Sequence, residues 1–470
     1  MSIITSRRAL LGAFASAAFS WSRGTRPNIV LILCDDLGFG DLGCYGNRII
    51  HTPNLDRMAA GGVRFTEFHT TSPVCTPTRA SLMTGHYPQR YGIHSADVPE
   101  SSLRYSVPAS ALTIAEVLHE AGYYTAHIGK WHLGEPPDAP HPRQQGFDHF
   151  FGLFGGRPSS PWIKYARSAD PEMILNEQRP TVHKGHVTDV QTNGALEVLS
   201  KMERNRPFFL NLWFNAPHEP LAPLPEQKEL YRHWEEGEQT YFQTVTNIDL
   251  AVGRVLAKLD EMGAASNTLV LFLSDNGPEV HTWRYSRGTA TPLRGMKTQM
   301  WEGGIRVPAI ARWPGRITPG TISAAIASAL DVFPTFAAAA GAPVPRSADL
   351  DGGVDLVETL RAGNNLATRP LVFEHFVGQR GTQPYSLPVA LRKGHWKLFS
   401  AIDGSRFALY DLSRDPGEEH DVAAGNPGIL KELQGDLAKW RARYPYRPLP
   451  PTQRVETPSL EELEKRYYHN

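Results

Sequence analysis

The stretch TRPNIVLILCDDLGFGDLG, residues 25–43, joins a near-continuous apolar run to an abrupt polar end. The run from Ile29 to Leu33 is typical of a strand that is covered on both faces in a parallel sheet. Asp35 and Asp36 follow it almost at once. We therefore predict a buried strand that delivers two carboxylates to one edge of a sheet.

Three further apolar runs end in polar side chains. They are YYTAHIGKWHLG, a strand predicted to end at Lys130 and His132, PFFLNLWFNAPHEP, ending near His218, and TLVLFLSDNG, ending at Asp275 and Asn276. Helical stretches such as ALTIAEVLHEAGY and residues 241–262 lie between them, and this alternation predicts an α/β sandwich. Because ligands in such sheets bind outside the carboxyl ends of the strands, we expect these polar side chains to meet at one edge.

The C-terminal part has a different pattern. Residues 388–423 form short alternating runs split by AspGly and AspProGly turn signals, which predicts a small antiparallel sheet. A final helix is expected from about Pro427 to Trp440, and the Pro- and Asp-rich residues 341–355 form the expected hinge region. The predicted division is a large domain over residues 25–360 and a smaller one over residues 361–470.

The charge balance excludes some partners. The 470-residue chain has 48 Lys and Arg against 48 Asp and Glu, so no overall positive field attracts nucleic acid or an anionic membrane. Local positive groups must hold any anionic substrate. The three cysteines are too few for a disulfide framework. The sequence leaves open a disulfide bond between Cys34 and Cys44, but we favour the interpretation that both cysteines are small buried residues.

The N-terminus has the features of an export signal. Arg7 and Arg8 precede an uncharged, alanine-rich run from Ala9 to Trp21 that is too short to span a bilayer. SRRALL resembles the twin-arginine pattern that directs folded bacterial proteins to export, although a chance arginine pair in a frayed tail would look similar. We assign residues 1–24 to this signal and expect an exported, periplasmic protein without a transmembrane segment in its mature chain.

A second stretch, SPVCTPTRASLMTG at residues 72–85, places one cysteine between two prolines. Each proline disfavours helical geometry in the residue before it, and Arg79 to Met83 is good helix-forming sequence closed by Gly85. Cys75 is therefore predicted at a helix N-terminus, where free amides and the helix dipole favour an anion. A small buried residue is the alternative.

The polar groups at the predicted sheet edge suit a hard cation and an oxyanion. The oxygen ligands that Ca²⁺ or Mg²⁺ prefers come from Asp35, Asp36, Asp275 and Asn276. Two adjacent carboxylates at a buried strand end would repel each other without a cation. The potential donors around them are Arg79, Lys130, His132, His218 and Lys297. Each alone is an ordinary loop or core residue, but together they predict a pocket for a tetrahedral oxyanion ester.

Several motifs occur in the order and spacing of one enzyme family. They are DDLGFGDLGCYG near the start, CTPTRASLMTG at 75–85, GKWHLG at 129–134, APHEP at 216–220, SDNGPE at 274–279, LRGMKTQMWEGGIRVPAIARWPG at 293–315, and LRKGHWKLF and LYDLSRDPGE near the end. From residue 26 to about 425 the chain resembles the type I sulfatases of the alkaline-phosphatase superfamily. This resemblance implies a large, mostly parallel mixed sheet sandwiched by helices, with a smaller C-terminal antiparallel sheet and helix.

The resemblance also implies a mechanism for sulfate ester hydrolysis. Cys75 matches the cysteine that a formylglycine-generating maturation enzyme oxidises to an aldehyde. One hydroxyl of the aldehyde hydrate attacks sulfur, and the other expels sulfate as the aldehyde reforms. The implied ligands of Ca²⁺, with Mg²⁺ as the other candidate, are Asp35, Asp36, Cys75, Asp275 and Asn276.

The resemblance assigns the remaining positions to substrate and proton handling. Arg79 would orient the diol, and Lys130 and Lys297 would contact the sulfate oxygens. His132 would accept the proton whose loss drives sulfate release. His218, with Lys297, would protonate the departing alcohol.

Two other functions remain open at this point. A related enzyme that hydrolyses phosphate or phosphonate esters could use the same scaffold, and relative rates on nitrophenyl sulfate and nitrophenyl phosphate discriminate the two. A non-catalytic protein that binds sulfated glycans is less favoured, because this sequence keeps every motif residue.

The substrate is expected to be a carbohydrate or aryl sulfate. Specificity should come from the segments between motifs, which are residues 157–173, 281–292 and 374–386. Their aromatic residues Trp162, Trp283 and Tyr285, with several arginines, suit stacking on a sugar ring and pairing with further anionic groups.

We expect replacement of Arg7 and Arg8 by lysine to leave active enzyme in the cytoplasm, because the twin-arginine route reads that pair. Cell fractionation followed by an activity assay measures this. Continued export of the double variant would refute the predicted route.

Overall fold

The computed structural model describes residues 26–96, 106–134, 139–155, 169–178, 180–203, 205–280, 285–363, 366–375 and 387–445. The predicted export signal lies outside these ranges. Most residues of the three predicted specificity segments also lie outside these ranges, including Trp162 and Trp283.

Strands and helices alternate through most of the described chain. The strands are β1 (Asn28–Cys34), β2 (Val63–Phe65), β3 (Phe68–His69), β4 (Tyr124–Lys130), β5 (His149–Leu153), β6 (Glu172–Leu175), β7 (Thr181–Val182), β8 (Phe208–Trp213), β9 (Thr268–Ser274), β10 (Ala309–Arg312), β11 (Thr321–Ser323), β12 (Ala327–Ser328), β13 (Leu371–Glu374), β14 (Val389–Lys393), β15 (Trp396–Ser400) and β16 (Phe407–Asp411). The helices are α1 (Pro53–Ala60), α2 (Cys75–Thr84), α3 (Ile114–Glu120), α4 (Val187–Lys201), α5 (Glu236–Glu261), α6 (Glu302–Ile305), α7 (Val332–Ala340), α8 (Val357–Ala362) and α9 (Pro427–Arg443).

Among the described residues, the main sheet has ten strands in the order β11-β2-β10-β9-β1-β8-β4-β5-β6-β7. Its centre is parallel, because β1 pairs in parallel with β8 and β9, and β4 pairs in parallel with β8 and β5. Strands β10 and β6 add antiparallel pairings towards the two edges. The predicted mostly parallel mixed sheet is confirmed.

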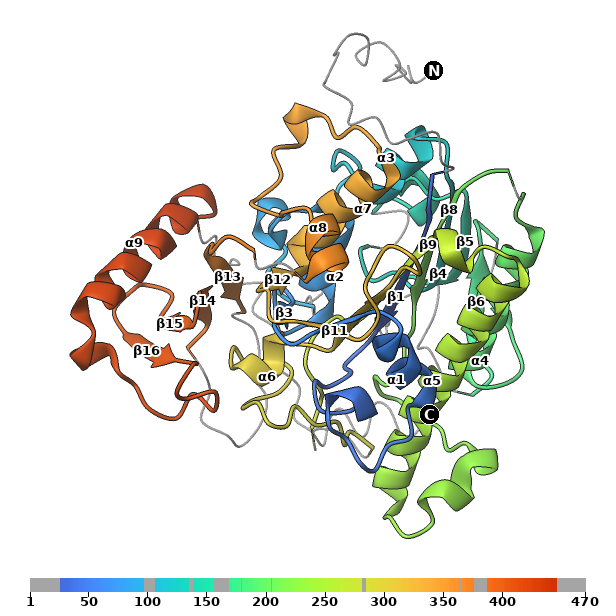
Figure 1. The fold of residues 1–470 in the computed structure, drawn as a ribbon, viewed down its shortest axis with the longest axis horizontal. Coiled ribbons are helices and arrows are strands. Elements are labelled where there is room, and N and C mark those ends of the chain that lie inside the picture. Colours follow the sequence, from blue (N-terminus) through green and yellow to red (C-terminus); the bar gives the residue numbers. More distant parts are fainter. Residues whose placement is uncertain are drawn as a thin grey trace.

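Helices cover both faces of this sheet (Figure 1). Helices α1, α4 and α5 pack together on one face, and α2, α3, α7 and α8 pack together on the other. This double cover explains the apolar run that the sequence analysis started from. The side chains from Ile29 to Cys34 point alternately to the two faces, and all are almost completely buried.

The carboxyl ends of the central strands are level with one another. Cys34 is in register with Ser274, and Trp213 is in register with both Leu33 and Gly129. The polar residues predicted at these strand ends therefore reach one edge. Strand β4 ends at Lys130, so His132 lies just beyond it, and β8 ends at Trp213, earlier than the predicted end near His218.

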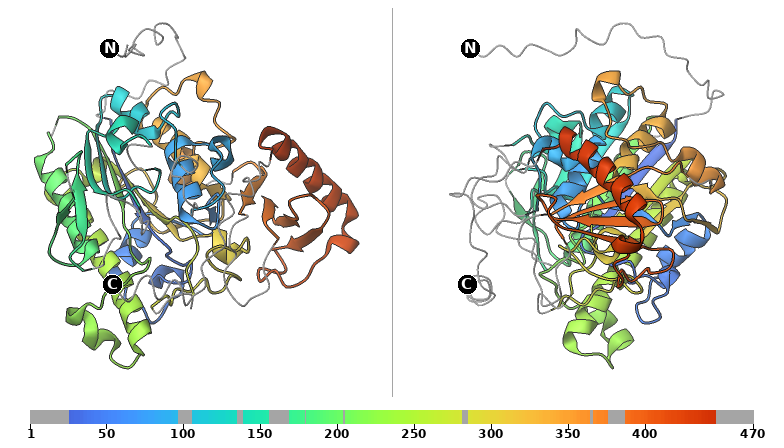
Figure 2. Two further views of the ribbon diagram at one scale, coloured as in Figure 1. Left: turned by 180° about the vertical axis from the view of Figure 1, so that it is seen from behind. Right: turned by 90° about the vertical axis from the view of Figure 1, so that its left-hand side faces the viewer.

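The C-terminal part forms a separate four-stranded antiparallel sheet in the order β13-β14-β15-β16, with α9 packed on β14 and β15 (Figure 2). The small sheet and final helix are confirmed, and α9 extends three residues beyond the predicted end. Val357 and Leu360 of α8 still belong to the main core, whereas Leu371 opens the small sheet.

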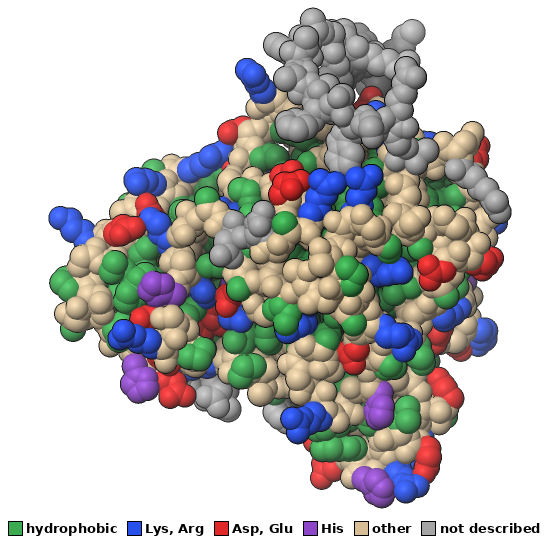
Figure 3. Space-filling view, viewed as in Figure 1, with side chains coloured by type: hydrophobic (Ala, Val, Ile, Leu, Met, Phe, Trp, Pro, Cys, Tyr) green, Lys and Arg blue, Asp and Glu red, His purple; other side chains and the backbone are tan. Residues whose placement is uncertain are grey.

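No helix in the described ranges is long and apolar enough to cross a membrane. All three cysteines are free, which leaves the bridge between Cys34 and Cys44 unformed. Cys44 is only partly buried, contrary to our expectation, because it lies in the loop after β1 rather than inside the sheet. Figure 3 shows basic and acidic side chains interspersed over the visible face, in keeping with the balanced composition.

A buried ion pair joins the C-terminal sheet to the main domain. Lys397 of β15 lies 3.0 Å from Glu302 of α6 and 2.8 Å from Glu418, and all three side chains are almost fully buried. Glu418 also accepts a hydrogen bond from the backbone N–H of Glu302 at 2.7 Å. The segment that enters α6 is thereby held against the small sheet.

Replacing Lys397 by methionine should destabilise the protein by about 3–5 kcal/mol, because two buried carboxylates would lose their shared cation. Denaturant unfolding of the purified variant measures the loss. Lys439→Met is the matched control, since Lys439 is exposed and should leave the unfolding free energy nearly unchanged. Equal stability of the two variants would contradict the prediction.

Candidate functional site

Two adjacent aspartates leave β1 at the carboxyl edge of the sheet. Asp36 has a φ of 71°, a conformation that few non-glycine residues adopt and that is concentrated at functional sites. Its backbone N–H donates to the Asp275 carboxylate at 3.3 Å, and the N–H of Leu37 donates to the Ser274 hydroxyl at 2.9 Å. These bonds tie the ends of β1 and β9 together.

Carboxylate oxygens gather at this junction. Oxygen or sulfur atoms of Asp35, Cys75 and Asp275 lie within 4.8 Å of one another, and Asp36 lies within the same distance of Asp35. The amide N–H of Asn276 donates to Asp36 at 2.7 Å. The side chains of this cluster's polar residues are all buried, namely Asp35, Asp36, Asp275 and Asn276.

Two oxygen atoms of this cluster show whether the residues present could bind a cation. Oδ1 of Asp35 and Oδ1 of Asn276 are buried and have no hydrogen-bond partner among the described residues. Buried polar atoms are normally paired, and unpaired carboxylate and amide oxygens are the donor set of Ca²⁺ and Mg²⁺. The residues present therefore fit a hard divalent cation.

The crowding of charge shifts the pKa values of the three carboxylates. Burial raises the pKa of Asp275 to about 7, and Asp35 adds to the rise. Burial also raises the pKa of Asp36. For Asp35 burial acts in the same direction, but Lys130, His218 and Arg79 outweigh it and lower the pKa. Without a cation, Asp275 is therefore only partly ionised near neutral pH.

Cys75 is the first residue of α2, as predicted, and Val74 before it is extended. The side chain is only 2% exposed. Burial raises the pKa of its thiol to about 12, with Asp35 and Asp275 adding to the rise and Lys130 opposing it. We expected the helix N-terminus to favour an anion at this position, and for the thiol this expectation is wrong. Burial beside two carboxylates disfavours the thiolate more than the helix dipole favours it.

Arg79 links three elements of the site. Its Nε donates to Asp275 at 2.9 Å, and Nη1 donates to the backbone carbonyl of Lys130 at 2.9 Å. Nη2 forms an ion pair with the same Asp275 carboxylate at 2.7 Å. It also lies 5.1 Å from the ring centre of Trp213. These contacts fix the guanidinium, which extends from the first turns of α2, in one position with its charge inside the cluster.

Two lysines neutralise the first two aspartates. Nζ of Lys130 lies 2.5 Å from Asp35, and Nζ of Lys297 lies 2.7 Å from Asp36 and 3.5 Å from Glu279. Burial opposes the charge of Lys297, but Asp36 and Glu279 outweigh it and raise its pKa well above the usual value. Both lysines therefore carry their charge at the sheet edge.

The two histidines differ in environment. His132 is partly buried, with its Nδ1 atom inaccessible to solvent, and desolvation followed by Lys130 and Arg79 lowers its pKa well below the usual value, so the ring is neutral. Its φ is 57°, and Gly155 gives the ring room, because a Cβ there would lie 2.6 Å from Cδ2 of His132. His218 is 29% exposed and donates from Nδ1 to the Glu219 carbonyl at 2.5 Å, which leaves Nε2 3.8 Å from Asp36.

The structure brings all of the predicted site residues together at one edge of the sheet. They are Asp35, Asp36, Cys75, Arg79, Lys130, His132, His218, Asp275, Asn276 and Lys297. Sequence reasoning gave no role to Glu279, although it lies inside the SDNGPE motif and contacts Lys297. It also missed Asp41, which accepts hydrogen bonds from the Tyr241 hydroxyl at 2.6 Å and from the backbone N–H of Thr289 at 2.9 Å.

The doubly covered sheet and the polar cluster at its carboxyl edge define an alkaline-phosphatase-like α/β protein. Comparison with known families narrows this class. The sulfatase family profile matches residues 27–342, and the profile of the N-sulphoglucosamine sulphohydrolase C-terminal region matches residues 296–443. The chain belongs to the sulfatase family and is a sulfuric ester hydrolase.

Several relatives resemble the chain over most of its length. Arylsulfatase A of Homo sapiens is 35% identical over 447 residues, which cover 87% of this chain and 85% of the relative. N-acetylgalactosamine-6-sulfatase of Homo sapiens is 36% identical over 443 residues, which cover 84% and 81%. The solved structure of Ps i-CgsB in complex with k-i-k-neocarrahexaose is 30% identical, with a TM-score of 0.79 and coverage of 88% of this chain and 93% of that one.

The raised pKa of Asp275 predicts that a cation stabilises the protein more at high pH. In the metal-free chain the folded carboxyl titrates at about 7 instead of 3.8. Between these two pH values the Asp275 carboxyl is protonated in the folded state and ionised in the unfolded state, which favours the folded state. This contribution to stability is lost as the pH rises through about 7. The same proton competes with the cation, so binding should weaken on the order of 30-fold between about pH 8 and pH 5.5.

Thermal unfolding with and without Ca²⁺ at the two pH values measures this effect. The rise in unfolding temperature should be clearly larger at the higher pH, and Asp275→Asn should lose that difference. An equal rise at both pH values would contradict the assignment of Asp275 as a ligand.

Proposed function

We propose that the chain hydrolyses sulfate esters of carbohydrates, using a formylglycine made from Cys75 and a bound divalent cation. The observation that carries the proposal is the grouping of Cys75 with Asp35 and Asp275 within 4.8 Å. A buried cysteine among carboxylates is a poor thiolate nucleophile. The aldehyde hydrate would supply the attacking hydroxyl and a second hydroxyl through which sulfate is expelled.

Asp35, Asp36, Asp275 and Asn276 would hold the cation, with the side chain of residue 75 completing its ligands. Calcium is the favoured ion and magnesium the other candidate, because all four side chains offer oxygen. A bound cation lowers the pKa of a hydroxyl that it contacts and neutralises charge on a sulfate oxygen.

Arg79, Lys130 and Lys297 would organise the reacting groups. Arg79 already has a fixed orientation through Asp275 and the Lys130 carbonyl, so its charge can orient the side chain of residue 75 without reorganisation. The two ammonium groups would donate hydrogen bonds to sulfate oxygens, where negative charge accumulates in the transition state.

The two histidines would move different protons. Nδ1 of His218 is occupied by the Glu219 carbonyl, so Nε2 is the atom that can give a proton to the leaving alcohol. His132 is neutral and its buried Nδ1 has no hydrogen-bond partner among the described residues. It would therefore accept the proton released when sulfate departs.

The assignment of a carbohydrate substrate rests on relatives and on the sequence. Ps i-CgsB was solved in complex with k-i-k-neocarrahexaose, and one curated relative is named for a sulfated amino sugar. The resemblance to arylsulfatase A keeps an aryl sulfate as the other candidate. An exported, periplasmic enzyme with aromatic specificity segments would meet polysaccharide fragments.

Maturation should precede complete folding. Cys75 is only 2% exposed in the folded chain, so a maturation enzyme would need to reach it earlier. If the twin-arginine signal operates, the conversion also occurs before export, because that route carries folded protein.

The tryptic peptide from Phe65 to Arg79 tests this proposal. Mass spectrometry should find an aldehyde at position 75 in protein from a host with a maturation system, together with turnover of nitrophenyl sulfate. Full sulfatase activity with only unmodified thiol would overturn the mechanism.

Loss of His218 should depend on the leaving group. Nitrophenolate departs without a proton, whereas a sugar alkoxide is too basic to do so. We expect His218→Ala to slow sugar sulfates by a factor on the order of 10²–10⁴ and nitrophenyl sulfate noticeably less, as measured by kcat for both substrate types.

Loss of His132 should instead slow all substrates to a similar turnover. Sulfated enzyme should accumulate, visible by intact mass and as a burst of one alcohol per site. If both variants show the same leaving-group dependence and neither accumulates the adduct, this division of roles fails.

A further inference from the structure

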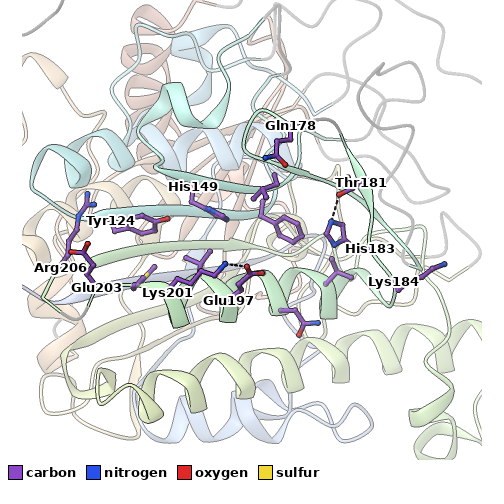
Figure 4. A pocket seen from close by; sticks show the side chains of 17 residues that line it. Tyr124, His149, Gln178, Thr181, His183, Lys184, Glu197, Lys201, Glu203 and Arg206 are labelled. Atoms are coloured by element: carbon purple, nitrogen blue, oxygen red, sulfur yellow. Dashed lines mark hydrogen bonds and ion pairs between the residues drawn. The ribbon is translucent and has the colours of Figure 1, made fainter.

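A pocket of about 560 Å³ lies between the outer strands of the main sheet and α4 (Figure 4). We call it the edge pocket. One wall comes from β4 and β5, the opposite wall from α4, and the β6–β7 hairpin closes one end. Its lining includes Tyr124, His149, Phe151, Gln178, His183 and Lys201.

The edge pocket is separate from the proposed catalytic residues. Tyr124 and His149 are the first residues of β4 and β5, whereas Lys130 is the last residue of β4. Lys130 lies six positions after Tyr124, which is about 20 Å along a strand at roughly 3.3 Å per residue. Phe151, in register with Ile128, brings the inner end of the pocket closer to that edge, but none of the proposed catalytic or metal-binding residues lines the pocket.

Ring side chains follow one another along the pocket. Tyr124, His149 and Phe151 come from neighbouring strands, and His183 packs edge-on against Phe151 at 5.1 Å. Gly194 makes this arrangement possible, since a Cβ there would lie 2.5 Å from Cδ1 of Phe151. Glycine within a helix costs about 1 kcal/mol relative to alanine, so the close approach of the ring to α4 is kept at some expense of helix stability.

The lysine and arginine side chains that line the pocket are already paired. Lys201 lies 2.5 Å from Glu197, and Lys184 lies 2.8 Å from Asp170. Arg206 lies 3.3 Å from an aspartate and donates to two backbone carbonyls. Glu203 adds a carboxylate at the same end. Glu197, Asp170 and Asp148 balance these three cations, so no excess of positive charge at the pocket favours a second sulfate site.

Neutral polar groups, in contrast, are available. The hydroxyl of Tyr124, the ring nitrogens of His149 and the side-chain amide of Gln178 have no hydrogen-bond partner among the residues that the structure describes. Burial lowers the pKa of His149, and the nearby carboxylate of Glu197 opposes only part of this shift. The pKa stays below its usual value, so the ring is uncharged at neutral pH. Arg206 covers the ring of Tyr124 at 5.5 Å and Phe151 is buried, so the partly exposed ring of His149 and the outer edge of Tyr124 remain as apolar surface. Such surface beside neutral donors and acceptors matches the CH groups and hydroxyls of a sugar.

We propose that the edge pocket is a second, non-catalytic binding site for a neutral, hydroxyl-bearing segment of a carbohydrate chain. This inference rests on the proposed function, because it supposes that the sulfated substrate is part of an oligosaccharide. Such a site would retain the polymer while the carboxyl edge of the sheet removes sulfate.

The test uses the mature, cation-loaded enzyme and chemically desulfated oligosaccharides of carrageenan, chondroitin sulfate and heparin. Calorimetric titration should detect binding of at least one of them, and sodium sulfate should not displace it. His149→Ala and Gln178→Ala should each weaken this binding on the order of 10-fold, a difference of about 1.4 kcal/mol. His395→Ala, on the distant C-terminal sheet, is the matched control and should bind as wild type does.

Turnover of nitrophenyl sulfate and thermal unfolding should be unchanged in all three variants, which shows that they fold and that the catalytic residues are intact. Binding to none of the oligosaccharides, displacement by sulfate, or equal binding by wild type and both pocket variants would each overturn the inference. Absence of nitrophenyl sulfate turnover in the mature wild type would instead refute the proposed function, whatever the titration shows.

Discussion

The site depends on a buried cluster of three carboxylates. Asp35, Asp36 and Asp275 are drawn from two adjacent strand ends into one desolvated volume, where like charges repel strongly. In this structure each has its own cation, since Lys130 pairs with Asp35, Lys297 with Asp36 and Arg79 with Asp275. A divalent ion bound to the same oxygens would release the two lysines to a sulfate, which couples metal binding to substrate binding.

The fold maintains this crowding. Parallel strands with level carboxyl ends bring the loops together, and helices on both faces exclude water from the strands that carry them. The loop after β1 is fixed by the hydrogen bonds of Asp41 with Tyr241 and Thr289, and the segment that carries Lys297 is followed by α6, which the small sheet holds through Lys397. Both the main sheet and the small C-terminal sheet therefore contribute to the position of the proposed catalytic groups.

Much of the fold and of the site could be predicted from the sequence because local patterns encode them. The run Ile29–Leu33 indicates a doubly covered strand, and the motifs mark the site residues by resemblance. The start of α5 at Glu236 was missed because the residues that begin it, the capping box of Glu235 and Glu238, are polar and do not register in apolar spacing. Contacts between distant segments could not be predicted either. The edge pocket likewise arises only when Gly194 meets Phe151 in the folded chain.

The central claim is that these carboxylates form a cation site on which turnover depends. Elemental analysis of the purified, active protein tests it most directly, together with activity before and after exhaustive chelation. The account predicts one calcium or magnesium ion per chain, loss of turnover on its removal, recovery on its return, and neither metal nor recovery in Asp35→Ala. Full activity of wild-type protein that contains no divalent metal would contradict it.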